Sequence, residues 1–276
     1  MHYGMTTGIM GAATDPSPPP PPPTPVDFAP LVITGSTGDD ELYVYDGYGG
    51  SLFVAYGDAI AGFEGANRLI LITTGGGMDT VVIESDYAIT TNLGDGDDTF
   101  DGFYAFGNLT VFGDFGNDFI QGGNGNDQLF GGQGRDALFG DLGDDTVSGG
   151  DGSDALFGGS GRDSLNGGVG NDLLGFGLRD KVNGGDGDDT FQLTGDDGLR
   201  GAITLDFNDG DVLNFSRLPQ IQVSDLSLVG GRLIVYNLNQ GISCSFGGVE
   251  EFDTIQDAIE SGQLVLSTLF DSDTFG

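Results

Sequence analysis

Residues 122–140 read GGNGNDQLFGGQGRDALFG, and the pattern of this stretch repeats after nine residues. In each unit Gly stands at positions one, two and four, Asp at position six and an aliphatic residue at position eight. Nine residues are too few for a helix with its turn, but they can hold a turn of about six residues and a strand of about three. The unit therefore predicts short strands with one inward-pointing side chain each.

The same phase continues well beyond this stretch. From Gly113 to Gln192 the chain divides into nine consecutive units, one of which, FGLRDKVN, is a residue short and lacks its fourth-position Gly. Position six is Asp in all nine units, and position eight is always apolar: Ile120, Leu129, Leu138, Val147, Leu156, Leu165, Leu174, Val182 and Phe191. A Gly-rich disordered linker has no reason to keep both phases over such a length. The pattern predicts an all-β parallel β-roll, a solenoid in which two units form one coil.

Alternate units of such a roll stack on the same edge. One edge then carries Asp118, Asp136, Asp154, Asp172 and Asp189, and the other carries Asp127, Asp145, Asp163 and Asp180. The four gaps on one edge and three on the other allow at most seven sites between stacked turns. One apolar residue per unit is little burial for nine ordered residues, and stacked carboxylates repel one another. We therefore expect cations to be required for folding.

The chemistry of these gaps favours calcium. Each gap offers carboxylate and carbonyl oxygens without His or Cys, and a hard cation with six or more oxygen ligands suits such a cage. The predicted side-chain ligands are the nine stacked aspartates and Asp98, with Asp180 less favoured because Arg179 and Lys181 flank it. Glycines allow the turn carbonyls to approach one another. The predicted carbonyl ligands are Gly123, Gly125, Gly132, Gly134, Gly150, Gly152, Gly159, Gly161, Gly168 and Gly170.

These nonapeptides resemble the RTX repeat, also called the hemolysin-type calcium-binding repeat. The resemblance is tight over 113–192 and loose over 31–112, and 203–219 (ITLDFNDGDVLNFSRLP) resembles the segment after the roll in RTX proteases and lipases. It implies a β-roll in which aspartates and turn carbonyls bind Ca²⁺. It also implies type I secretion through an uncleaved C-terminal signal, with folding triggered by external calcium. The expected location is secreted, extracellular or on the cell surface.

The sequence suggests four segments. Residues 1–30 contain nine of the ten prolines and predict a disordered Pro-rich linker. Residues 31–112 hold degenerate repeats that extend the roll as an irregular solenoid, with Asp79, Asp98 and Asp118 spaced by 19 and 20 residues. Residues 113–192 form the regular roll. Residues 193–276 predict a C-terminal β cap with the secretion signal and one short helix, with Thr254 as its N-cap and Gly262 as its C-cap.

Composition excludes several classes of partner. The chain carries 43 acidic residues against 8 Lys plus Arg, a formal net charge of −35. Such a polyanion repels nucleic acid and anionic membranes, and its natural small partners are cations. No apolar run is long enough to span a bilayer, and the N-terminus does not resemble a cleaved signal peptide. The extracellular ligand cannot be named from the residues.

The motifs of the enzymes that accompany such repeats are missing. His2 is the single histidine, so neither an HExxH zinc site nor a histidine base is available in the sequence, and no Ser has Gly two residues before and two after it. We expect a calcium-binding protein without catalysis that acts as a structural, surface or adhesive module. The alternative is the calcium-binding tail of a secreted carbohydrate-active or other hydrolytic enzyme.

Overall fold

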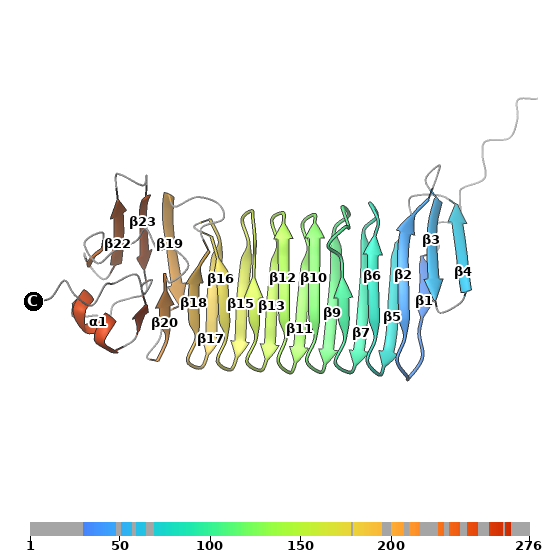
Figure 1. Cartoon of the computed structure of the whole chain (residues 1–276), viewed down its shortest axis with the longest axis horizontal. Coiled ribbons are helices and arrows are strands. Elements are labelled where there is room, and N and C mark those ends of the chain that lie inside the picture. Colours follow the sequence, from blue (N-terminus) through green and yellow to red (C-terminus); the bar gives the residue numbers. More distant parts are fainter. Residues whose placement is uncertain are drawn as a thin grey trace, which may run out of the picture.

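The computed structural model describes residues 30–47, 51–56, 59–64, 69–177, 179–194, 200–206, 210–215, 226–228, 232–237, 242–247, 254–261 and 263–265. The expected Pro-rich linker over 1–30 lies outside these ranges except for Pro30. Within them the chain forms an elongated stack of coils made almost entirely of strands (Figure 1). No helix of the described part is long and apolar enough to cross a membrane.

Two sheets of twelve strands face each other. The first sheet contains, in spatial order, β1 (Leu31–Thr34), β5 (Ile70–Gly76), β7 (Ile89–Asp95), β9 (Leu109–Phe115), β11 (Gln128–Gln133), β13 (Thr146–Asp151), β15 (Ser164–Val169), β17 (Lys181–Asp186), β19 (Arg200–Asp206), β23 (Ile242–Gly247), β22 (Arg232–Asn237) and β21 (Leu226–Leu228). The second contains β24 (Leu264–Val265), β20 (Val212–Asn214), β18 (Thr190–Leu193), β16 (Leu173–Phe176), β14 (Ala155–Phe157), β12 (Ala137–Leu142), β10 (Phe119–Asn124), β8 (Thr99–Asp101), β6 (Thr80–Glu84), β2 (Glu41–Asp46), β3 (Ser51–Tyr56) and β4 (Ala59–Glu64). Odd and even strands alternate between the sheets along most of the chain, which is the predicted parallel β-roll.

The register follows the nonapeptide phase. Ile120 of β10 pairs in parallel with Leu138 of β12, which pairs with Leu156 of β14, while Leu129 of β11 pairs with Val147 of β13. These eighth-position side chains are fully buried. They form two apolar columns that meet between the sheets, so the core is one residue wide per strand. The predicted all-β parallel β-roll is confirmed.

Other strand pairings appear near both ends of the stack. Strands β2, β3 and β4 pair antiparallel, as do β21, β22 and β23. Near the C-terminal end the helix α1 (Ile255–Ser261) follows Thr254, whose carbonyl accepts the Ala258 N–H at 3.1 Å. The short helix predicted there is confirmed, although Gly262 lies outside the described residues. These antiparallel strands and the helix interrupt the plain repetition of coils.

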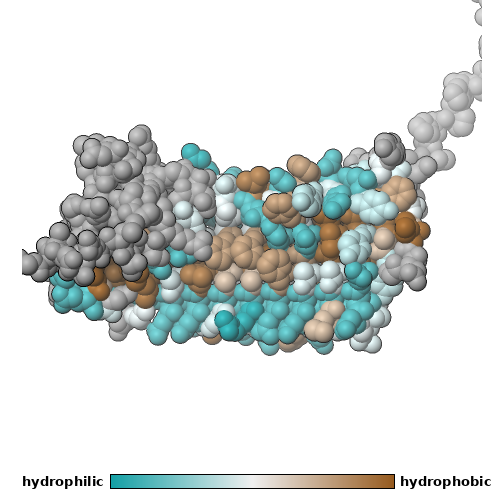
Figure 2. All heavy atoms as spheres, viewed as in Figure 1, coloured by the Kyte–Doolittle hydropathy of each residue, from teal (hydrophilic) through white to brown (hydrophobic). Residues whose placement is uncertain are grey.

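The outer faces are not uniformly polar. Phe139 and Phe157 stack with ring centroids 5.2 Å apart on β12 and β14, and Phe112 and Phe130 stack at 5.0 Å on β9 and β11. These rings occupy the position after the buried one, so they point away from the core. Figure 2 shows apolar side chains gathered along the middle of the visible face above a polar margin.

Candidate metal centre

Aspartates lie in two straight rows at the two edges of the roll. The first aspartate row precedes strands of the second sheet and comprises Asp40, Asp79, Asp98, Asp118, Asp136, Asp154, Asp172, Asp189 and Asp211. The second aspartate row precedes strands of the first sheet and comprises Asp127, Asp145, Asp163 and Asp180. All thirteen side chains are buried. The structure thus brings together the two predicted stacks and lengthens one of them.

One carboxylate oxygen of each stacked residue joins neighbouring coils. The backbone N–H of Asp118 donates to Asp136 Oδ1 at 2.8 Å, and the N–H of Asp136 donates to Asp154 Oδ1 at 2.8 Å. The second row repeats this arrangement, with the N–H of Asp127 donating to Asp145 Oδ1 at 2.8 Å. Each bond satisfies an N–H that the turn would otherwise leave unpaired in a buried position. The rows therefore stabilise the stacking of coils without any metal.

The second carboxylate oxygen is left without a donor. Oδ2 is buried and has no hydrogen-bond partner in Asp79, Asp98, Asp118, Asp127, Asp136, Asp145, Asp154 and Asp172. It lies over the first Gly of its own unit, because a Cβ built on Gly131 would overlap Asp136 Oδ2. A buried carboxylate oxygen without a donor is costly unless a proton or a cation neutralises it. These orphaned atoms fit the predicted cation.

The turn carbonyls supply the other oxygens. A Cβ at Gly150 would overlap the carbonyl oxygen of Gly132, and one at Gly152 would overlap that of Gly134. These carbonyls therefore point from one coil toward the next. All ten predicted carbonyl ligands lie in turns with positive φ: Gly123, Gly125, Gly132, Gly134, Gly150, Gly152, Gly159, Gly161, Gly168 and Gly170. Their role as ligands, like that of the aspartates, stays a prediction.

Asp also occupies the second position of two units. Asp114 and Asp141 adopt positive φ of 72° and 70°, where the other units place Gly. Asp tolerates this left-handed region better than most residues with a side chain. The expectation that these two units fold like the others is confirmed.

Burial makes the stacked carboxylates weak acids. Desolvation raises the pKa of Asp118 and Asp145 to about 7, against an ordinary value of 3.8, although a backbone N–H bond opposes the shift in each. It raises the pKa of Asp98, Asp127, Asp136 and Asp172 to about 6. Neighbouring carboxylates add to the increase in every one of these residues. In the absence of metal, a neutral proton-bound form is therefore favoured near neutral pH.

The first row is closed by protein groups at its N-terminal end. Asp40 accepts hydrogen bonds from the Tyr56 hydroxyl at 2.5 Å and from the Ser36 backbone N–H at 2.6 Å. Burial raises the pKa of Asp40, but the bonds from Tyr56 and Ser36 outweigh burial and hold that pKa below its usual value. Both oxygens of this carboxylate are satisfied, so Asp40 has less need of a cation than the residues behind it.

The short unit alters the end of the second row. Asp180 keeps its place, because its Oδ1 accepts the Asp163 N–H at 2.9 Å. Its Oδ2, however, accepts the backbone N–H of Gly177 at 2.7 Å. A hollow of the surface beside it is lined by Arg162, Arg179 and Lys181 together with row residues. This finding supports the expectation that the gap between Asp163 and Asp180 is the weakest site.

Sequence reasoning did not place Asp40, Asp79 or Asp211 among the candidate ligands. Each is followed by any residue and then by a buried apolar one, as in Asp211-Val212-Leu213. That three-residue signal is too short to separate row members from other acids in a chain with 43 of them. Their spacing from the next row member also departs from eighteen residues.

The donor set points to a hard cation. In the part of the chain that the structure describes, no three His, Cys, Asp or Glu side chains cluster as a metal site. Each gap therefore would combine few carboxylates with several carbonyl oxygens, a mixture that suits Ca²⁺ and not thiolate- or imidazole-binding metals.

Comparing Asp154→Ala with Asp180→Ala separates calcium binding from hydrogen bonding. Asp154 adjoins two regular gaps, whereas Asp180 already uses both oxygens on backbone N–H groups. Loss of hydrogen bonds alone would make Asp180→Ala the more damaging change. We expect the opposite: the calcium concentration for half-folding rises about tenfold or more in Asp154→Ala and less in Asp180→Ala. Parallel calcium titrations followed by circular dichroism measure this, and an equal or larger shift for Asp180→Ala contradicts the assignment.

The raised pKa values predict competition between protons and calcium. An acid whose pKa is higher folded than unfolded destabilises the fold fully above the folded pKa, and this penalty is relieved as pH falls through it. We therefore expect the metal-free roll to gain stability as pH falls from above about 7 toward the unfolded value near 3.8. Calcium should bind more weakly over the same range. Calcium titrations at several pH values test this, and a half-folding concentration independent of pH contradicts it.

The comparison with known families agrees with this geometry. Residues 110–138 and 139–174 match the family model of the RTX calcium-binding nonapeptide repeat (4 copies). No curated protein matches the chain. The matched residues contain the regular part of both aspartate rows, including Asp118 and Asp172. Over these residues the chain belongs to the RTX calcium-binding repeat family, as its nonapeptides predicted.

Proposed function

We propose that this chain is a secreted calcium-binding protein whose roll folds outside the cell when Ca²⁺ binds. Once folded, it serves as a structural, surface or adhesive module without catalysis. The observation that carries the proposal is the row of buried Oδ2 atoms without donors, eight of them in the residues described above. A chain that places so many buried charges at regular intervals needs a cation for its stability.

The chain's own residues prepare the sites. The Oδ1 bonds between coils set the orientation of each carboxylate, so Oδ2 is held over the first Gly of its unit. Glycines at positive φ turn the carbonyls of one coil toward the next. When bound, Ca²⁺ supplies positive charge shared by these carboxylate and carbonyl oxygens. Up to about seven ions would fit the regular stretch from Gly113 to Gln192, one in each gap between stacked aspartates.

Calcium levels offer a reason for folding on one side of a membrane only. Sites of extracellular modules bind with dissociation constants of roughly 10⁻⁴ to 10⁻³ M, so they stay empty at cytosolic calcium. The unneutralised rows would then keep the roll open inside the cell, in a form that a type I secretion apparatus can transport. Outside, binding would close the coils and make the folding irreversible in practice.

The folding prediction is tested on the full chain. We expect little β-structure in EGTA and a cooperative gain of β-structure with millimolar Ca²⁺, because the cation neutralises the stacked carboxylates. Mg²⁺ should substitute poorly, since it demands a tighter octahedral site. Far-UV circular dichroism at neutral pH measures both responses. An identical spectrum with EGTA and with calcium contradicts calcium-triggered folding.

Export is tested by two truncations. The resemblance to RTX proteins places the secretion signal after the roll, so deleting residues 212–276 should abolish release through a heterologous type I exporter. Deleting residues 1–30 serves as the control and should leave release intact. Immunoblots of medium and cells measure both. Release of the first truncation, or dependence on residues 1–30 instead, contradicts the proposed direction of export.

A further inference from the structure

The segment between β8 and β9 breaks the nonapeptide pattern with the residues GFYAFGN (102–108). Three large rings stand exposed within it: Phe103 at 49%, Tyr104 at 63% and Phe106 at 65% of their surface. Solvent-exposed aromatic residues this close together cost solubility unless they meet a ligand or partner. The calcium rows have no use for these rings.

The backbone of this segment is held in place. Ala105 is fully buried, its N–H donates to the Gly102 carbonyl at 2.7 Å, and its carbonyl accepts the Asn124 N–H at 3.0 Å. The Phe106 N–H donates to the Ser85 carbonyl at 3.0 Å. The rings are thus presented by an ordered turn anchored to two neighbouring coils. Such preorganisation lowers the entropic cost of binding.

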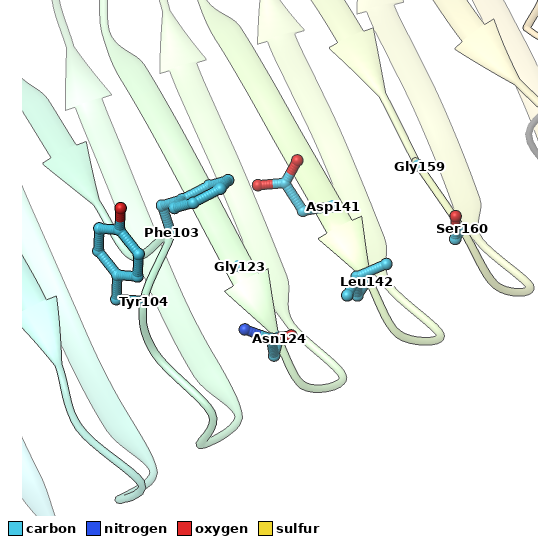
Figure 3. Close-up of a pocket in the computed structure, with 8 residues that line it drawn as sticks. All are labelled: Phe103, Tyr104, Gly123, Asn124, Asp141, Leu142, Gly159 and Ser160. Carbon is cyan, nitrogen blue, oxygen red and sulfur yellow. The ribbon is translucent and has the colours of Figure 1, made fainter.

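Two of the rings line one end of a surface groove of about 460 Å³ (Figure 3). Phe103 and Tyr104 lie edge to face with centroids 4.9 Å apart. From them the groove crosses Asn124 on β10, Asp141 and Leu142 on β12, and Ser160 in the next coil. Phe106 belongs to the same turn but does not line the groove. The groove therefore runs along the stack, across the strands.

The groove combines apolar surface with hydrogen-bonding groups at regular intervals. Asn124 pairs in register with Leu142, which bridges to Ser160, so one coil separates each from the next, about 4.8 Å. An amide, a carboxylate and a hydroxyl offer both donors and acceptors, and Asp141 is partly engaged by the Gln121 amide at 2.7 Å. A fitting ligand has apolar ring faces, many hydroxyls and a repeating extended form. Polysaccharides meet all three requirements.

Charge narrows the class of polysaccharide. The formal net charge of −35 disfavours a polyanionic glycan, even after partial neutralisation by calcium. A small organic cation would use the rings and Asp141, but it would leave the donors of Asn124 and Ser160 unused. We propose that this groove binds a neutral polysaccharide, stacking sugar rings on Phe103 and Tyr104. This inference rests on the proposed calcium-folded roll, of which it names the extracellular ligand.

Affinity electrophoresis with the full chain in calcium tests the groove. Gels would contain hydroxyethyl cellulose, soluble starch or glucomannan as neutral probes and alginate as the anionic one. We expect at least one neutral polymer to retard the protein and alginate to leave it unretarded. The double variant Phe103→Ala/Tyr104→Ala should weaken retardation about tenfold or more. Phe106→Ala, which removes an equally exposed ring of the same turn, should change it by less than about twofold.

Further arms decide the alternatives. Asp141→Asn keeps a side chain that tolerates positive φ and should retain most of the retardation, whereas binding that requires the carboxylate charge would assign the groove to cations and overturn the proposal. Equal losses in Phe106→Ala and the double variant would indicate unspecific adhesion and also overturn it. Calcium-dependent circular dichroism accompanies every variant. A roll that folds with calcium but is retarded by no neutral polymer refutes the groove alone, while absent folding refutes the proposed function.

Discussion

The hydrogen bond between an aspartate Oδ1 and the N–H of the aspartate one coil earlier is the contact on which this structure depends. It ties coils together at 2.8 Å in both rows, as between Asp118 and Asp136. The same bond forces the second oxygen of the carboxylate into a buried place without a donor. One side chain therefore supplies both the contact that stacks the coils and the charge that opposes stacking. Folding and cation binding are two aspects of a single requirement.

This requirement explains the invariant positions of the unit. The first Gly leaves room for Oδ2 of its own unit, as Gly131 does for Asp136. The second and fourth allow positive φ and the close approach of carbonyls from the preceding coil, as at Gly150 and Gly152. The eighth residue fills a core only one side chain wide. No other position faces a constraint of this kind, which is why the remaining residues vary.

The regular roll could be predicted because its spacing is constant. An eighteen-residue period placed alternate aspartates on opposite edges and the eighth-position residues in the core, as the strand register confirms. The ends could not be predicted in the same way. Asp40 precedes Asp79 by 39 residues, because the antiparallel strands β3 and β4 are inserted between them. The closure of that row by Tyr56 depends on long-range contacts that no local period encodes.

The two edges of the roll differ in what they tolerate. The first row continues from Asp79 to Asp211, beyond the regular repeats on both sides. The second begins only at Asp127, whose Oδ1 accepts the N–H of Leu109 in place of another aspartate. The turn ahead of Leu109 is therefore released from the repeat, and here the chain carries its exposed aromatic rings. One edge maintains the stack, which leaves the other free to acquire a surface for binding.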